Sequence, residues 1–378
     1  MVKIKINYLF FVLMILGIFE PAYFEDGNLH IFFVVCKLIS LIFLFDFIKR
    51  YKLYKSLAGK KFIIYLFLVL IFFIWILISI SVTKTGSFSY VLNLIDTFAY
   101  VVANCVFYTK YNKDIFYIYK KLMGSLLILN FLTLFSENFT YFLGHKNAIT
   151  MYIILYLFGC LGTIGYSNAT NNIRWLFIIF ILLIYSIIFD CSTAIGCVLV
   201  VGAGIFGSRI KNYKGVIKTF ILICVVAGLL VYYSGYLDSV VSFITGILSR
   251  SSTFTGRKAV WSWSVNYIQK SPVFGHGTYI EFTPWSNIYK HVYSAHNIFL
   301  DVSCRFGIIS AVLLIIPCLY TLKCLIKKLT YINFSKITLL LSLILYSLME
   351  AGSMALFMAM ITFYVYSYFV EENKIIIE

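Results

Sequence analysis

The sequence alternates long apolar runs with short basic segments along almost its whole length. A helix needs about 20 apolar residues to cross roughly 30 Å of hydrocarbon. Twelve runs approach that length, namely residues 4–19, 29–48, 62–82, 88–109, 115–136, 148–167, 173–189, 194–208, 216–234, 306–326, 337–350 and 353–370. The eighth run is short and rich in glycine, and only two residues separate the last two, so ten spans also fit. We expect an all-α polytopic integral membrane protein with 10–12 transmembrane helices, forming a single membrane domain over residues 1–378.

Composition places the chain in the membrane class and limits what else it can be. Hydrophobic residues make up 62% and charged residues 12% of the sequence, and the mean hydropathy is +0.94. A net charge of +16 would indicate nucleic-acid binding in a soluble protein, but here the basic residues cluster between apolar runs. The nine cysteines include no C-x-x-C pair, so neither a disulfide framework nor a cysteine metal site is predicted. We expect the lipid bilayer as a partner, and no nucleic acid.

The basic residues also predict the topology. With the N-terminus inside, 22 of the 31 Lys and Arg residues fall on the cytoplasmic side, eight fall outside, and Lys37 lies within a span. Both termini are then cytoplasmic, and one large outer loop covers residues 235–295, between the ninth and tenth spans. This topology places Glu350 and the polar residues of the loop on the outer face. Because ATP and nucleotide sugars are absent there, neither is expected as a substrate.

The outer loop contains a predicted amphipathic helix. From Thr255 to Ser271 apolar residues recur at helical spacing, and Pro272 ends the pattern. Arg257 and Lys258 fall in its first turn, where positive charge opposes the helix dipole and calls for a counter-anion. Free N–H groups and a guanidinium at a helix start suit a diphosphate. Contact with anionic lipid headgroups explains the two cations equally well.

Two further segments of the loop carry glycine and histidine. Gly275 and Gly277 flank His276, a pattern typical of a tight turn that brings the backbone close to another group. His296 and Asn297 open the next apolar run, which places the imidazole at the membrane surface. Because histidine titrates near about pH 6.5, a neutral His296 can accept a proton from a hydroxyl group. Helix capping or a structural polar contact is the alternative explanation.

Three short motifs occur in order in this region: G-R-K-A-V-W at 256–261, P-V-F-G-H-G at 272–277 and A-H-N-I-F-L at 295–300. This order resembles the signature of the O-antigen ligase and polymerase superfamily, whose members carry G-R-x-x-x-W, P-x-x-G-x-G and H-N-x-x-L in one large outer loop. Upstream, G-H-K-N at 144–147 and the S-T-A that follows Cys191 resemble weaker motifs of the family. Many members carry an arginine in the second of these stretches, but residues 191–194 of this sequence include none.

The resemblance implies glycosyl transfer from undecaprenyl diphosphate on the outer face of a bacterial plasma membrane, with inversion and without a nucleotide sugar, metal or other cofactor. By the same resemblance His296 is the base on the acceptor hydroxyl and Arg257 binds the diphosphate. Further candidates for the diphosphate are Arg250, Arg305 and Lys258, and those for contacts to the sugar or the loop are Trp261, Asn297, Gly275, Gly277 and His145. The implied partners are undecaprenyl-diphosphate-linked glycan repeat units, as donor and acceptor, and a chain-length regulator protein.

Several alternatives stay open. We favour a polymerase of O-antigen or capsular polysaccharide over a ligase of the same superfamily, because the chain is of modest length and rich in Tyr, Phe and Ile. A lipid-linked glycan flippase fits the many spans and the charged Lys37 and Asp96 near span centres, although a structural ion pair explains those two residues as well. Glu25 and Asp26 resemble an acidic pair that other membrane glycosyltransferases use as base or metal ligand. If His296 is not the base, these two, His145 and Glu350 are the reserve candidates.

Overall fold

The structure is a computed structural model, which describes residues 6–25, 27–134, 141–164, 169–207, 215, 257–281, 294–327, 331–351 and 354–377. The predicted span 216–234, Arg250, Asp26 and most of the predicted outer loop lie outside these ranges. The described helices are α1 (Ile6–Ile18), η1 (Ala22–Phe24), α2 (His30–Lys49), α3 (Tyr51–Thr83), α4 (Phe88–Tyr111), α5 (Asp114–Asn130), η2 (Phe131–Thr133), α6 (Ile149–Ile164), α7 (Ala169–Ile188), α8 (Ser192–Gly207), α11 (Arg257–Lys270), α12 (Ile298–Phe306), α13 (Ile308–Lys327), α14 (Tyr331–Met349) and α15 (Met354–Ile377).

The all-α membrane class is confirmed. Within the described ranges, six helices are long and apolar enough to cross a membrane, and the other apolar helices at predicted spans are shorter. Each predicted run except 216–234 coincides with one of these helices, and the number of spans stays a prediction. Among these six helices, the apolar stretch of Met354–Asn373 in α15 is the most buried, at 89%, and that of α2 is the least buried, at 28%. On α2, Ile31 and Phe45 are about two-thirds exposed, as expected of side chains that face lipid.

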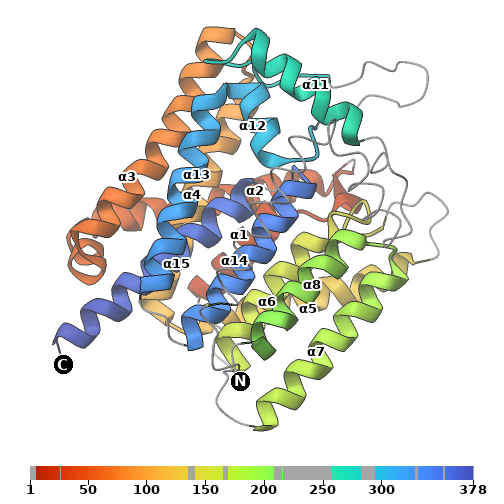
Figure 1. Ribbon diagram of the computed structural model, residues 1–378. Coiled ribbons are helices and arrows are strands. Elements are labelled where there is room, and N and C mark those ends of the chain that lie inside the picture. Colours follow the sequence, from red (N-terminus) through yellow and green to blue (C-terminus); the bar gives the residue numbers. More distant parts are fainter. Residues whose placement is uncertain are drawn as a thin grey trace.

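The helices pack side by side, with α5 to α8 on one side of the bundle, α3, α4 and α13 on the other, and α14 and α15 between them (Figure 1). The short helices α11 and α12 lie together at one end, and the chain termini lie at the opposite end (Figure 1). Several boundaries differ from the prediction. The largest difference is in α3, which runs back through the basic segment to Tyr51 with a break at Gly59, whose φ is 77°. The predicted span 306–326 begins instead as a corner, where Gly307 joins α12 to α13 with a φ of 82°.

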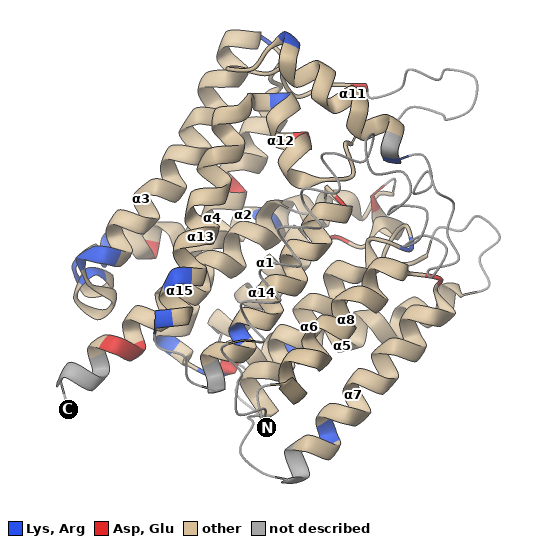
Figure 2. Cartoon of the chain, viewed as in Figure 1, with Lys and Arg blue, Asp and Glu red and all other residues tan. Residues whose placement is uncertain are grey.

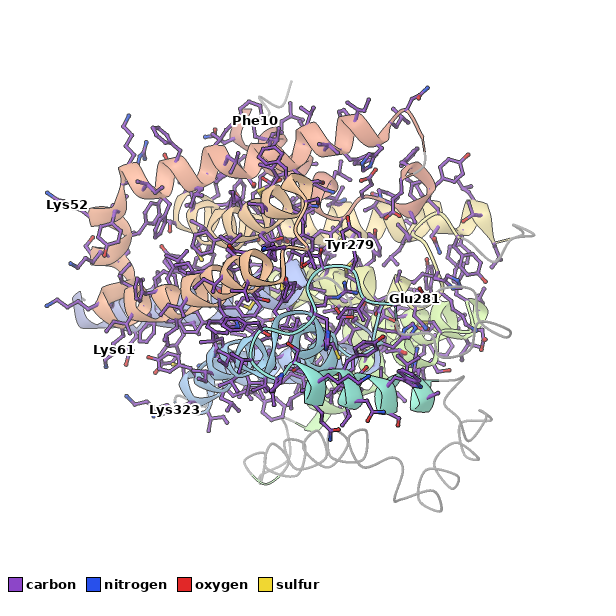
Figure 3. All side chains as sticks on the ribbon, turned by 90° about the horizontal axis from the view of Figure 1, so that it is seen from above. Phe10, Lys52, Lys61, Tyr279, Glu281 and Lys323 are labelled. Atoms are coloured by element: carbon purple, nitrogen blue, oxygen red, sulfur yellow. The ribbon has the colours of Figure 1, made fainter. Side chains whose placement is uncertain are left out.

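The charged residues gather toward the two ends of the bundle and leave its middle largely uncharged (Figure 2). Lys52, Lys61 and Lys323 project from the same edge, away from Tyr279 and Glu281 of the outer loop (Figure 3). This separation is what the predicted topology requires. Which end faces the cytoplasm stays a prediction.

One predicted ion pair is corrected by the structure. Lys37 Nζ lies 3.9 Å from Glu20 Oε2, and His30 Nδ1 lies 3.0 Å from Glu20 Oε1. Glu20 therefore takes the place that the sequence predicted for Asp96, which is buried and interacts with Lys37 electrostatically. The reason is the packing of α1 against α2, where Gly17 brings the end of α1 against the backbone of Lys37.

Candidate functional site

The predicted amphipathic helix is present as α11, and it packs on α12 with its apolar face. Val260 and Trp261 are buried against Leu300 and Cys304 of α12. The indole Nε1 of Trp261 donates a hydrogen bond to the Ala295 carbonyl at 3.1 Å, directly before His296. With 2% of Trp261 exposed, its ring supports the loop rather than offering a face to a sugar.

The turn after α11 makes the close backbone approach that its glycines predict. Gly275 and Gly277 have φ of 68° and 88°, in the region that favours glycine. A Cβ on Gly275 would lie 2.4 Å from the backbone of Arg305, and one on Gly277 would lie 1.8 Å from Thr85 Oγ1. His276 contributes its ring to the same turn, with Nε2 2.8 Å from the Tyr267 carbonyl. The turn therefore locks α11 onto α12 and onto the end of α3.

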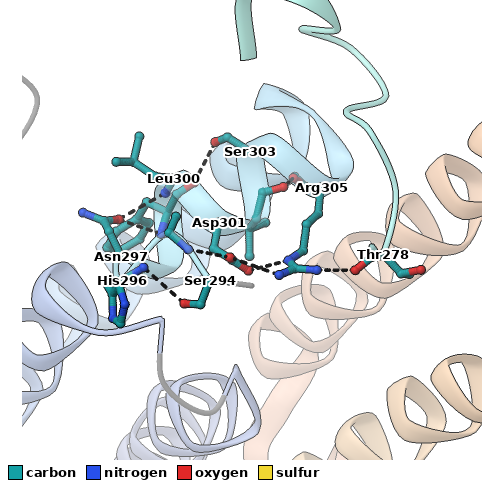
Figure 4. A network of polar contacts seen from close by, with 12 residues as sticks. Thr278, Ser294, His296, Asn297, Leu300, Asp301, Ser303 and Arg305 are labelled. Carbon is teal, nitrogen blue, oxygen red and sulfur yellow. Dashed lines mark hydrogen bonds and ion pairs between the residues drawn. The ribbon is translucent and has the colours of Figure 1, made fainter. Parts of the chain in front are cut away.

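Arg305 stabilises this assembly from inside (Figure 4). Its Nε and Nη2 donate to the two carboxylate oxygens of Asp301, at 2.7 and 3.4 Å, and its Nη1 donates to the Thr278 carbonyl. The same Asp301 carboxylate accepts the N–H of Ala295 at 3.0 Å. Only 15% of each charged side chain is exposed. All three guanidinium nitrogens thus hold the protein together, which favours a positioning role for Arg305 over the predicted contact with a diphosphate.

Asn297 fixes the start of α12 and joins it to α14. Its Oδ1 accepts hydrogen bonds from the backbone N–H groups of Phe299 and Leu300, at 2.9 and 3.1 Å, which is the N-cap arrangement (Figure 4). Its Nδ2 donates to the Leu348 carbonyl of α14 at 3.2 Å. His296, just before this cap, has a left-handed φ of 49° and donates its N–H to Ser294 Oγ. The cap therefore places His296 beside the C-terminal end of α14.

Glu350 lies at that end of α14. It is 8% exposed, and its carboxylate contacts two of the predicted site residues. Its Oε2 lies 3.2 Å from His296 Nδ1, and its Oε1 accepts a hydrogen bond from Arg257 Nη2. A carboxylate at a helix C-terminus and a guanidinium at a helix N-terminus each oppose the dipole of their own helix. Each supplies the opposite charge that the other needs. Glu350 is therefore the counter-anion within the protein that was expected from the sequence for Arg257.

From the sequence, Glu350 is named only as a reserve base, and its contacts with Arg257 and His296 are not predicted. The signal that could have singled it out is its isolation. Glu350 is the sole acidic residue between Asp301 and Glu371, and it directly follows an apolar run of α14. An acid in such surroundings is costly to bury unless a cation pairs with it.

The two upstream motifs also lie together. Lys146 Nζ lies 2.5 Å from Asp190 Oδ2, and Thr150 Oγ1 lies 3.2 Å from Cys191 Sγ. The pKa of the Cys191 thiol is raised, mainly because the thiol is buried. The hydrogen bond with Thr150 and the charge of Lys146 oppose this shift, and the charge of Glu350 adds to it. Cys191 therefore contacts the first upstream motif through Asn147 and the start of α6 through Thr150.

The other candidates are either exposed or outside the residues that the structure describes. His145 is exposed on the turn before α6, and in the described ranges no contact joins its side chain to His296. Glu25 is exposed beyond η1, Asp26 and Arg250 lie outside the described residues, and for Lys258 the structure describes only the backbone within α11. Among the described residues, no three His, Cys, Asp or Glu side chains are grouped so that they could hold a metal ion.

The fold and this site define a multi-pass membrane protein whose polar cluster lies at one end of the bundle, beneath a short surface helix. A protein-family model described as O-antigen ligase matches residues 175–315, from α7 into α13, and the match includes all three loop motifs. The match confirms the predicted resemblance of this region to the O-antigen ligase and polymerase superfamily. Members of that family are membrane enzymes that act on lipid-linked glycans. A search of curated protein sequences finds no match.

Proposed function

We propose that the protein is a glycosyltransferase that polymerises undecaprenyl-diphosphate-linked oligosaccharide repeat units into O-antigen or capsular polysaccharide, on the outer face of the bacterial plasma membrane. The observation that carries the proposal is the carboxylate of Glu350, which contacts both His296 and Arg257. A base for an acceptor hydroxyl and a cation for a diphosphate are the two groups that this transfer needs, and here one buried side chain holds them together.

In this proposal His296 is the general base. Glu350 accepts the hydrogen of Nδ1, which leaves the lone pair of Nε2 to face the acceptor hydroxyl. The His296 side chain is 37% exposed, so a sugar can reach the ring from solvent. As the acceptor oxygen bonds to the anomeric carbon of the donor, its proton passes to Nε2. A positioned base of this kind contributes about 10²–10⁴-fold to a rate.

Arg257 acts on the leaving group. When the bond from the anomeric carbon to the diphosphate oxygen breaks, the electron pair stays on the diphosphate, and its growing negative charge needs fixed donors. A guanidinium has five N–H donors, so the contact of Nη2 with Glu350 does not exhaust it. Attack by the acceptor on the face opposite the leaving group inverts the anomeric configuration. No step of this scheme uses a nucleotide sugar or a metal ion.

The experiment that tests the function is deletion of the gene in its host, followed by analysis of the surface glycan. Loss of a polymerase leaves a working flippase and ligase, so the surface glycan should carry a single repeat unit where a separate ligase accepts it. Complete loss of surface glycan would favour a ligase of the same family or a flippase. Repeat units that accumulate on the inner leaflet would point to a flippase. The chain-length regulator stays an expectation from the resemblance.

A further inference from the structure

A diphosphate carries more negative charge than Arg257 can balance, because Glu350 already neutralises part of that guanidinium. The cations whose side chains the structure describes at this end are Lys84, Lys146, Arg257, Lys270 and Arg305. Lys270 stands at the other end of α11 from Arg257, about 20 Å along a helix of 14 residues. Lys84 lies beside Thr85, which bonds to Thr278 after that same far end. These two lysines are therefore too distant from Arg257 to share a diphosphate with it.

The two remaining cations differ in how firmly their carboxylate partners hold them. Arg305 and Asp301 are both 15% exposed, and Thr278 takes a further donor of Arg305. Separating that pair would leave a poorly solvated charge on each side, which is strongly unfavourable. Lys146 is 35% exposed, and its partner Asp190 is 69% exposed. Because water already solvates Asp190, Lys146 can leave this carboxylate for another anion at little cost.

Lys146 also has the right surroundings for an anion. It stands on the turn before α6, and Asp190 stands just before α8, so two helix N-termini meet beside the ion pair. The dipole of a helix favours negative charge near its N-terminus. The contact of Thr150 with Cys191 joins the two helix starts, and Cys191 Sγ also lies 4.0 Å from Oδ1 of Asn147, the neighbour of Lys146. Cys197 Sγ of α8 donates to the Ser342 carbonyl of α14 at 3.4 Å, and Gly196 and Gly204 of α8 face Leu345 and Thr338. The two helices are therefore antiparallel, and the start of α8 lies at the Glu350 end of α14.

We propose that Lys146 is a second cation of the diphosphate site, and that it exchanges Asp190 for phosphate oxygens when the lipid-linked substrate binds. This inference rests on the proposed function, since it assigns a further residue to the same substrate. Asp190 holds the ammonium group in place while the site is empty. No covalent step is involved, only the exchange of one anionic partner for another.

The test measures binding of undecaprenyl diphosphate, and of undecaprenyl monophosphate for comparison, to the full-length protein in nanodiscs. Lys146→Ala should weaken diphosphate binding by about tenfold, as expected for the loss of one charged contact. Monophosphate binding should change less. Lys146→Arg should bind nearly as well as the wild type. Lys270→Ala, which removes an exposed cation at the far end of α11, is the matched control and should bind the diphosphate like the wild type.

Asp190→Asn separates substrate binding from a purely structural ion pair. If Lys146 exchanges partners, removal of the competing carboxylate should leave diphosphate binding as tight as in the wild type or tighter. If the pair only stabilises the fold, Asp190→Asn and Lys146→Ala should weaken binding alike, and the inference is overturned. It is also overturned if Lys146→Ala binds normally while Arg257→Ala does not. A wild-type protein that binds no undecaprenyl diphosphate would instead overturn the proposed function itself.

Discussion

Replacement of Glu350 by glutamine should both destabilise the protein and slow its reaction. The change keeps the shape of the side chain but removes the charge that faces Arg257, whose side chain is 15% exposed. Breaking a fully buried ion pair by removing one partner costs about 3–5 kcal/mol. Because both side chains keep some solvent contact, we expect a loss near the lower limit, about 3 kcal/mol. The rate should fall by about 10²-fold, since the single amide oxygen of glutamine cannot accept from both Arg257 and His296, and the charge that stabilises a protonated His296 is lost.

The free energy of unfolding can be followed by tryptophan fluorescence during SDS titration, and the rate by polymer formation from a synthetic lipid-linked repeat unit. The double variant Arg257→Gln/Glu350→Gln should lose about 1–3 kcal/mol less stability than the sum of the losses in the two single variants. The reason is that the double variant leaves no unpaired buried charge. Glu25→Gln removes an exposed carboxylate and should change stability by about 0.5 kcal/mol or less. Strict additivity of the two changes, or a normal rate in Glu350→Gln, would refute the reasoning.

Further predictions test the topology, the metal, the turn and the arginine. A reporter that is active only outside the membrane should work when fused after Ser286 and stay silent after Tyr213, and the reverse would contradict the outer-face reaction. Activity should survive an excess of chelator, whereas loss restored by Mg²⁺ would show that a metal takes part. Gly277→Ala should cost about 2 kcal/mol or more, measured by the same SDS titration, because its Cβ meets Thr85 at 1.8 Å. Arg257→Lys keeps the charge but loses the planar fork, so polymer length should fall sharply if Arg257 binds the diphosphate.

The sequence predicted most of the fold because apolar length and basic clusters are local signals. Each predicted run in the described ranges is a helix, and the amphipathic pattern of the loop became α11 within two residues at its start and one at its end. The paired glycines also predicted a close approach at Gly275 and Gly277. What they could not indicate was the partner, since Thr85 and Arg305 meet this turn only through tertiary packing.

The site was harder to predict, because its central contact joins residues far apart in the sequence. His296 and Glu350 are separated by 54 positions, and Arg257 and Glu350 by 93. Motif order pointed to His296 and Arg257 but carried no information on the carboxylate between them. The same limit produced the wrong partner for Lys37, where charge and depth favoured Asp96 but the packing of α1 on α2 supplied Glu20.

The most direct test of the account is the initial rate of polymer formation by His296→Gln in purified protein supplied with a synthetic undecaprenyl-diphosphate-linked repeat unit. Glutamine keeps a hydrogen-bonding side chain but cannot take a proton from the acceptor. The account predicts a rate at least about 10²-fold below that of the wild type, with binding of undecaprenyl diphosphate retained. Polymer formation at close to the wild-type rate would show that His296 only orients the substrate, and would contradict its role as the base.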